Sequence, residues 1–443
     1  GSGRLHLSYP VEGFGSPLLC TSSLREQEEP YLLSLELARG KIAQVRDQIS
    51  EWDIAQKEIC KKARIACREA QQHFAFAASH QNQFDAACEA AELALQKACL
   101  AADFLVQCYA HHEISVTQQQ THHPLALFAG SMGDFAPDET WGEQFRQVFH
   151  QANVPLSWKE IETKQGKRCW DIADAQVEWC MQHRLLMRGG PLLDFSPEGL
   201  PSWLENWSDD LTNLQSLICD YIESAISRYF GKIRTWEVCA RGNTGGALGL
   251  SEEARLTLVA HTLEVARRVN DEIQLVIGIN QPWGEYQARE KHYLAPLQFV
   301  DALLRSGVGL SAVNLELPIG YEAGGCANRG LLDFSRMLDL WSCLGIPLHV
   351  TLAVPSCSSA DLFARSKGDV NNNQWRDGWT NETQAEWIQH YLPLLIAKPA
   401  VVSVEWAHFS DAQPHCFPHA GLLQSDGKPK PAYHFLVDYK NKS

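Results

Sequence analysis

Acidic side chains recur in the sequence at the places where predicted strands end. They are Asp194, Glu237, Glu285, Glu316 and Glu405. A carboxylate can give or take a proton and can attack an electrophilic carbon, so two of them together could catalyse hydrolysis. The alternative for each one is a structural ion pair with a neighbouring arginine. If the protein is an enzyme, Glu316 and Glu237 are the candidates for catalysis, whereas Asp194 and Glu405 are candidates for binding the substrate.

Arg241 directly follows another predicted strand end and is a further candidate for binding. Its guanidinium stays protonated at any ordinary pH, so it cannot shuttle a proton. We expect it to pair with Glu237 or Glu316, because a buried unpaired guanidinium costs several kcal/mol. These three side chains would then form the polar floor of a pocket. The expected rim of this pocket is formed by Asp194, Glu405 and His408.

Five tryptophans fall in predicted loops, where aromatic faces could stack on sugar rings. They are Trp203, Trp207, Trp283, Trp375 and Trp379. We single out Trp203 and Trp283 as candidates for binding a substrate. The alternative is that these rings only cap the hydrophobic core.

Strand-like and helical stretches alternate from residue 125 onward. The predicted strands are Leu125–Ala129, Val154–Trp158, Leu185–Arg188, Ile233–Val238, Gln274–Ile279, Ala312–Leu317, Leu348–Ala353 and Val401–Trp406. This alternation is typical of a parallel α/β protein, and eight repeats predict a (β/α)8 TIM barrel over residues 121–443. In that fold the functional groups lie on the loops after the strands, which is where the acidic residues fall.

The N-terminal part of the chain has a different pattern. Residues 31–120 carry apolar and small residues at helical spacing and predict a long helical hairpin that precedes the barrel. Residues 1–30 are expected to form an extended lead-in, and residues 1–3 (Gly-Ser-Gly) are typical of an expression-tag remnant. The hairpin could mediate homo-oligomer formation through residues 31–112, or it could simply pack on the main domain.

Composition excludes several classes of partner. The formal net charge of -15 argues against nucleic acid and anionic membrane surfaces. No apolar run approaches roughly 18 residues, so we expect no membrane span. The 14 cysteines are scattered without a C-x-x-C pair, so we expect no metal and no other cofactor, in a reduced, cytoplasmic protein. Because the natural N-terminus is unknown, secretion is kept as an alternative.

Several sequence blocks occur in a recognisable order. They are Asn153-Val-Pro-Leu-Ser-Trp158, Arg188-Gly189, Leu200-Pro-Ser-Trp-Leu204, Trp236-Glu-Val-Cys-Ala-Arg241, Gly345-Ile-Pro-Leu-His-Val-Thr351 and Val404-Glu-Trp-Ala-His-Phe-Ser-Asp411. Together they make the region from about residue 125 to 436 resemble glycoside hydrolase family 10, the xylanase-type barrels. The resemblance implies a TIM barrel and a carbohydrate or related small ligand.

The same resemblance implies a changed catalytic site. Enzymes of this family use two carboxyl groups about 5–5.5 Å apart, one as nucleophile and one as acid/base. The family's acid/base aligns with Arg241 and its nucleophile with Leu352. A Gln and a His that contact the sugar in the family align with Glu316 and Pro318. The resemblance therefore implies the family's fold without its ordinary mechanism.

Three functions are consistent with these observations. The first is a catalytically degenerate barrel that binds a carbohydrate. The second is a glycoside hydrolase whose catalytic carboxylates have moved, with Glu316 as the leading candidate. The third is a scaffold that acts through its helical arm. The distances between carboxyl groups at the top of the barrel discriminate between the first two.

Overall fold

The protein divides into two compact units. The computed structural model describes residues 1–52, 60–120, 125–289, 292–322, 324–365 and 369–442. Unit 1 comprises Gly1–Leu125, Ala327–Asp339 and Asn371–Pro399, and unit 2 comprises Ala126–Cys326, Leu340–Val370 and Ala400–Ser443.

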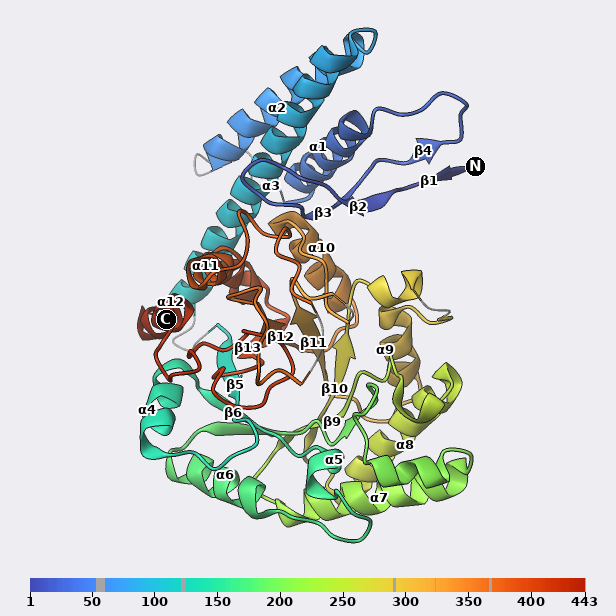
Figure 1. Cartoon of the computed structure of the whole chain (residues 1–443), viewed down its shortest axis with the longest axis vertical. Helices are drawn as coiled ribbons and strands as arrows, with labels where there is room; N and C mark the ends of the chain where they lie inside the picture. The colour runs from blue at the N-terminus through green and yellow to red at the C-terminus, as the bar shows by residue number, and fades with distance from the viewer. Residues whose placement is uncertain (53–59, 121–124, 290–291, 323, 366–368, 443) are drawn as a thin grey trace. The chain divides into compact units, whose positions relative to one another are not determined.

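Unit 2 contains a closed barrel of parallel strands (Figure 1). The strands are β5 (Leu127–Ser131), β6 (Gln151–Val154), β7 (Leu186–Gly189), β8 (Leu193–Asp194), β9 (Thr235–Ala240), β10 (Gln274–Asn280), β11 (Ala312–Pro318), β12 (Leu348–Ala353) and β13 (Val401–Trp406). Neighbours follow the order β5-β6-β7-β9-β10-β11-β12-β13, and β13 pairs with β5 to close the ring. The short β8 pairs with the end of β9. The predicted TIM barrel is confirmed.

The helices of unit 2 follow the strands in alternation. They are α4 (Glu139–Val148), α5 (Trp158–Ile161), α6 (Asp171–Gln182), α7 (Leu211–Arg228), α8 (Glu252–Val269), α9 (Pro296–Arg305) and α12 (Pro431–Lys442). Side-chain caps fix several helix starts by satisfying backbone N–H groups that have no partner within the helix. The Asp138 carboxylate accepts from Trp141 N (2.8 Å) at α4, and the Ser251 hydroxyl accepts from Ala254 N (3.2 Å) at α8.

Residue alternation along the strands separates the barrel interior from its apolar exterior. In β11, Asn314 and Glu316 line the interior cavity, whereas Val313 and Leu315 are fully buried and do not. Side chains at successive positions of a strand point to opposite faces, so an apolar strand with polar residues at every second position delivers those residues to the lumen.

Unit 1 consists mainly of helices (Figure 1). They are α1 (Leu33–Trp52), α2 (Lys61–Ser79), α3 (Phe84–Gln120), most of α10 (Leu331–Ser342) and α11 (Asn381–Ala397), together with the short strands β1 (Ser2–Gly3), β2 (His6–Ser8), β3 (Leu18–Cys20) and β4 (Leu24–Arg25). Helices are present where the arm was predicted, and α1, α2 and α3 lie within its range. The arm was predicted to end at residue 120. Residues 121–124, which follow this boundary, and residues 53–59 within the arm lie outside the described residues.

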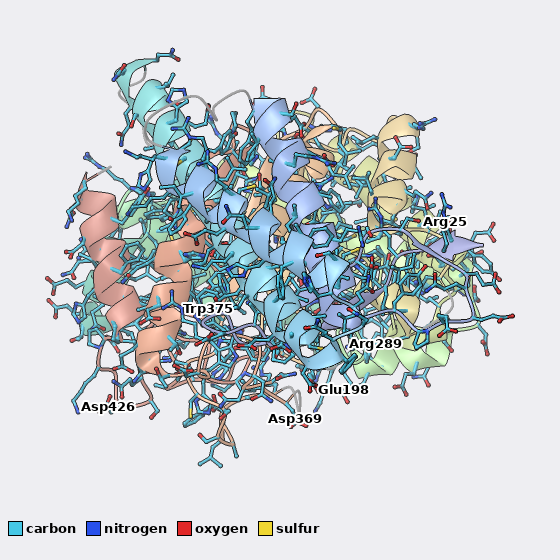
Figure 2. All side chains as sticks on the ribbon, turned by 90° about the horizontal axis from the view of Figure 1, so that it is seen from above. Arg25, Glu198, Arg289, Asp369, Trp375 and Asp426 are labelled. Carbon is cyan, nitrogen blue, oxygen red and sulfur yellow. The ribbon has the colours of Figure 1, made fainter. Side chains whose placement is uncertain are left out.

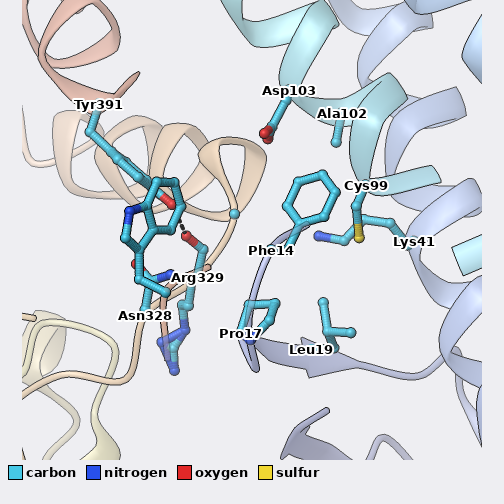
Figure 3. A pocket seen from close by; sticks show the side chains of 12 residues that line it. Phe14, Pro17, Leu19, Lys41, Cys99, Ala102, Asp103, Asn328, Arg329 and Tyr391 are labelled. Atoms are coloured by element: carbon cyan, nitrogen blue, oxygen red, sulfur yellow. Dashed lines mark hydrogen bonds between the residues drawn. The ribbon is translucent and has the colours of Figure 1, made fainter. Parts of the chain in front are cut away.

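The core of unit 1 combines apolar packing with buried polar contacts (Figure 3). The Lys41 ammonium lies 2.8 Å from Asp333, and the Tyr391 hydroxyl donates to the Arg329 carbonyl oxygen at 2.5 Å. The cavity between these groups has a volume of about 20 Å³. One water needs about 10–15 Å³, so this cavity is too small for an organic ligand. None of the described helices is long and apolar enough to cross a bilayer.

Candidate functional site

The barrel of unit 2 holds a cavity of about 180 Å³ at the carboxyl ends of its strands. The structure brings six of the predicted site residues together in its lining: Asp194, Glu237, Arg241, Glu316, Glu405 and His408. They come from different strands and loops, and their convergence follows from the parallel barrel, in which all strands end at the same side. The cavity is therefore the candidate functional site.

The deepest layer of the cavity is built around Arg188 of β7. Its guanidinium Nη2 pairs with Glu405 of β13 and lies 3.3 Å from Glu237 of β9. The three side chains are 1%, 2% and 3% exposed, so this is a fully buried ion triad. Arg188 Nε and Nη1 have no hydrogen-bond partner among the described residues. The guanidinium thus sets one positive charge against two carboxylates and does not use all of its donors.

Uncharged side chains complete the hydrogen bonds of this layer. The Asn153 amide donates to Glu405 Oε1 at 3.0 Å, and the Asn314 amide donates to Glu237 Oε2 at 3.1 Å. The Thr351 hydroxyl lies 2.9 Å from Asn314 Oδ1 and 3.3 Å from Glu405 Oε2. Groups on five strands are therefore connected, which fixes the orientation of both carboxylates.

A second layer lies closer to the cavity mouth. Arg241 Nε donates to Glu316 Oε2 at 2.9 Å, and Arg241 Nη1 donates to Asp194 Oδ2 at 2.8 Å. These side chains are 20%, 10% and 18% exposed, so water reaches this layer more than the one below. Asp194 is fixed in turn, because its Oδ1 accepts from Ser196 N at 2.9 Å.

A bulge and a glycine position these groups along β9 and β10. The register between the two strands shifts at Val238, so Glu237 and Ala240 both face the cavity although they are three residues apart. Arg241 then has a positive φ of 59°, a backbone conformation that costs a non-glycine residue about 1–2 kcal/mol. A Cβ at Gly278 would lie 2.5 Å from Glu237 Oε1 and 3.1 Å from Glu316 Oε1. The absence of a side chain at 278 therefore leaves room for both carboxylates.

Burial changes the protonation of several groups in the cavity. It raises the pKa of Glu237 to about 7, against the opposing Arg188 charge and with a contribution from Glu316. Burial also raises the pKa of Glu316, although the Arg241 guanidinium opposes this. The pKa of His408 falls to about 3, first because of burial and then because of the positive His415 and Arg241. His408 is thus neutral near pH 7, and its Nε2 accepts from Phe417 N at 3.1 Å.

Two expectations about the cavity need correction, those for Glu405 and Glu237. Glu405 lies in the deepest layer rather than at the rim, because it is inside β13 and pairs in register with Thr351. Glu237 does not pair with Arg241: it lies against Arg188, and Asp194 joins Glu316 on Arg241. Leu352 is fully buried but does not line the cavity, because its neighbours Thr351 and Ala353 take the inward positions of β12.

The two tryptophans that were expected to bind a substrate do not line the cavity. Trp203 Nε1 donates to the Glu162 carbonyl oxygen at 2.8 Å, and its ring packs edge-on against Trp158. Trp283 lies in the loop after β10, outside the cavity lining. Trp375, labelled in Figure 2, belongs to unit 1 and is 3% exposed. The aromatic ring that does line the cavity is that of Phe417, which is half-buried.

Sequence reasoning missed Arg188 and Asn153 as site residues. Arg188 stands alone among apolar residues near the end of a predicted strand, and a charge buried in such a strand requires a partner. This lone charge in an apolar strand could have identified Arg188 as a site residue. Asn153 precedes the predicted start of its strand, so nothing placed it inside the barrel.

Arg241→Ala is expected to lower the free energy of unfolding by about 1–3 kcal/mol, because two partly buried carboxylates lose their donor. Urea unfolding of the purified variant measures this change. Arg241→Gly is the matched control: it removes the same ion pairs but relieves the positive φ, so it should be more stable than the alanine variant by about 1 kcal/mol. Unchanged stability of the alanine variant would show that the two ion pairs contribute nothing.

A second acidic cluster lies in unit 2 outside the cavity. The ligand atoms of Asp361, Asp411 and His415 are within 4.8 Å of one another. The Lys430 ammonium already lies 2.5 Å from Asp411 and is itself buried. Asp411 therefore already has a counter-ion in the protein, and we assign no metal to the cluster.

Comparison with known proteins relates this barrel to one enzyme family. Residues 126–324 match the sequence profile of glycosyl hydrolase family 10. Endo-1,4-beta-xylanase 3 of Hypocrea jecorina is 33% identical over 102 residues, which span 23% of this chain and only 28% of that enzyme. Endo-1,4-beta-xylanase B of Thermotoga neapolitana is 20% identical over 295 residues, or 63% of this chain and 76% of that enzyme.

Solved structures extend the similarity at the level of fold. GH10 from Paenibacillus barcinonensis superposes with a TM-score of 0.56 at 18% identity, covering 72% of this chain and 96% of that one. Native xylanase 10B from Thermotoga maritima gives a TM-score of 0.54 at 15% identity, covering 72% and 97%. The chain therefore resembles glycosyl hydrolase family 10, and it carries a barrel of that family's fold.

Proposed function

We propose that the barrel binds a small carbohydrate in the cavity of unit 2 and does not hydrolyse xylan by the family's two-carboxylate mechanism. The observation that carries the proposal is the pairing of acids with guanidinium groups. Glu237 and Glu316 both line the cavity, and each one is held by an arginine, at 3.3 and 2.9 Å. A carboxylate held in this way is a weak nucleophile.

The end of β12 supports the loss of ordinary catalysis. The cavity-facing residues there are Thr351 and Ala353, and neither can act as a nucleophilic carboxylate. Leu352 also lacks a carboxyl group, so no residue from Thr351 to Ala353 can replace the family's nucleophile.

The lining of the cavity supports carbohydrate as the ligand. Sugar sites combine an exposed aromatic face with polar groups that bind hydroxyls, and Phe417 provides the face here. The volume of about 180 Å³ is below the usual range of about 300–1,000 Å³ for ligand pockets. We therefore propose a monosaccharide unit, either free or at the end of a chain, as the bound species.

Binding without turnover is the expected result when the purified protein is given sugars. We expect saturable heat in calorimetric titrations with a monosaccharide, and no release of reducing ends from xylan above that of a buffer blank. The physical reason is that the polar cavity is intact, while Glu237 and Glu316 are each paired with a guanidinium, that of Arg188 or Arg241. Failure of every monosaccharide to bind would contradict the proposal.

A second function is favoured by the convergence of Glu237 and Glu316 above Gly278. A pKa of about 7 would let Glu237 act as a proton donor, and Glu316 could then serve as the second carboxylate. Xylan hydrolysis that disappears in Glu316→Gln would support this rebuilt enzyme over a pure binding protein. Glu162→Gln is the matched control, because Glu162 is equally buried but lies outside the cavity.

A further inference from the structure

Two carboxylate oxygens in the cavity lack a hydrogen-bond partner among the described residues. Glu237 Oε2 is bound by Asn314 and lies 3.3 Å from Arg188, but its Oε1 has no donor. Glu316 Oε2 accepts from Arg241, and its Oε1 has no donor either. Both residues are more than nine-tenths buried and line the cavity. Neither oxygen is among the fully enclosed side-chain atoms without a partner, so both can be reached from the cavity, where water or a ligand can supply the donor.

The two oxygens face the same small space. They lie 2.5 and 3.1 Å from the position that a Cβ would take at Gly278, so their separation is at most the sum of these distances. An ammonium nitrogen makes hydrogen bonds of about 2.7–2.9 Å to carboxylates, so one such nitrogen could contact both oxygens at any separation up to that limit. One ammonium nitrogen that enters from the cavity could therefore be shared by Glu237 Oε1 and Glu316 Oε1.

The charges of the cavity favour a cation. Four carboxylates line it, those of Asp194, Glu237, Glu316 and Glu405, against the two guanidinium groups of Arg188 and Arg241. Each guanidinium is already shared between two of the carboxylates, and His408 is neutral. With every acid ionised the lining has a negative excess, which a buried site must balance with a proton or a cation. The raised pKa of Glu237 shows how the unliganded protein balances it.

We propose that this cavity selects an amino sugar, whose ammonium group binds between Glu237 Oε1 and Glu316 Oε1 above Gly278. The inference rests on the proposed function, because it specifies which class of carbohydrate the cavity takes. The sugar ring lies against Phe417, and the ammonium group replaces the proton that the carboxylates otherwise hold. A neutral sugar of the same shape leaves the two oxygens without a charged donor.

Calorimetric titrations with D-glucosamine, D-glucose and N-acetyl-D-glucosamine at neutral pH test the proposal, because only the first carries an ammonium group. We expect glucosamine to bind with a Kd about tenfold or more below that of glucose, as for a hydrogen-bonded charge. Glu237→Gln and Glu316→Gln should each abolish this preference. Glu162→Gln, a buried substitution outside the cavity, should retain it. Thermal unfolding of each variant confirms that it is folded.

The possible outcomes separate the two proposals. Equal affinity for glucosamine and glucose would overturn the amino sugar assignment and leave carbohydrate binding intact. Binding of none of the three sugars would overturn both. Ethanolamine serves as a cation without a ring: affinity equal to that of glucosamine would show that the cavity recognises an amine alone, which also contradicts a carbohydrate site. Preference for glucosamine that persists in both Gln variants would place the ammonium group elsewhere and reject the site above Gly278.

Discussion

Arg188→Met is expected to lower the free energy of unfolding by about 3–5 kcal/mol, the cost of leaving buried charges without their partner. Arg188 is 1% exposed and is the shared counter-ion of Glu237 and Glu405. Methionine keeps much of the side-chain length and fills the space, so the loss reports on charge rather than on a void. Urea unfolding followed by circular dichroism measures it.

Two further variants make this test specific. Arg228→Met breaks the exposed pair with Asp174, whose side chains are 41% and 40% exposed, and should cost about 1 kcal/mol or less. The triple variant Arg188→Met, Glu237→Gln, Glu405→Gln removes all three charges of the triad and should recover part of the loss. An Arg188→Met variant no less stable than Arg228→Met would mean that the triad is not a buried set of charges in solution.

The stability of the protein should depend on pH through Glu237. Burial raises its pKa from 4.5 to about 7 in the folded state. Between these values the folded protein keeps the proton while the unfolded chain has released it, so the folded state binds more protons. Stability from this group is therefore fully present below about pH 4.5 and is lost as pH rises through about 7, by about 3 kcal/mol in total.

Glu237→Gln isolates this effect because glutamine does not titrate. We expect the free energy of unfolding of the wild type, minus that of the variant, to decrease by about 3 kcal/mol from pH 4.5 to pH 7.5. Urea unfolding at half-unit pH steps gives both values. A difference that stays constant over this range would show that Glu237 remains ionised and that Arg188 outweighs burial.

The extent of the barrel could be predicted from sequence because its strands are buried on both faces and therefore read as apolar runs. The predicted bounds of β12 and β13 agree with the structure, and those of β10 and β11 differ by one residue. The prediction for β6 began at Val154, whereas the strand spans Gln151–Val154. Its Gln151 and Asn153 are polar because they point into the barrel interior, and the predicted run 154–158 instead contains Pro155 and the start of α5 at Trp158.

The sequence predicted which residues form the site better than it predicted which acid pairs with which guanidinium. Strand ends identified Glu237, Glu316 and Arg241 as neighbours, since any parallel barrel brings such positions together. Which acid meets which guanidinium depends on the bulge at Val238 and on the positive φ of Arg241, and no residue type in this segment signals either. Of the two partners expected for Arg241, Glu316 is present, whereas Glu237 is not and Asp194 takes the second place.

The buried triad also has a consequence for how the chain folds. Glu405 and Arg188 are 217 residues apart, and they belong to β13 and β7, which are not adjacent in the barrel. No hairpin and no four strands that are consecutive in the chain contain both residues, so Arg188 and Glu405 meet only after β13 has joined the sheet beside β5. Partial structures are thereby penalised relative to both the unfolded and the complete states. We therefore expect the triad to make closure of the barrel more cooperative.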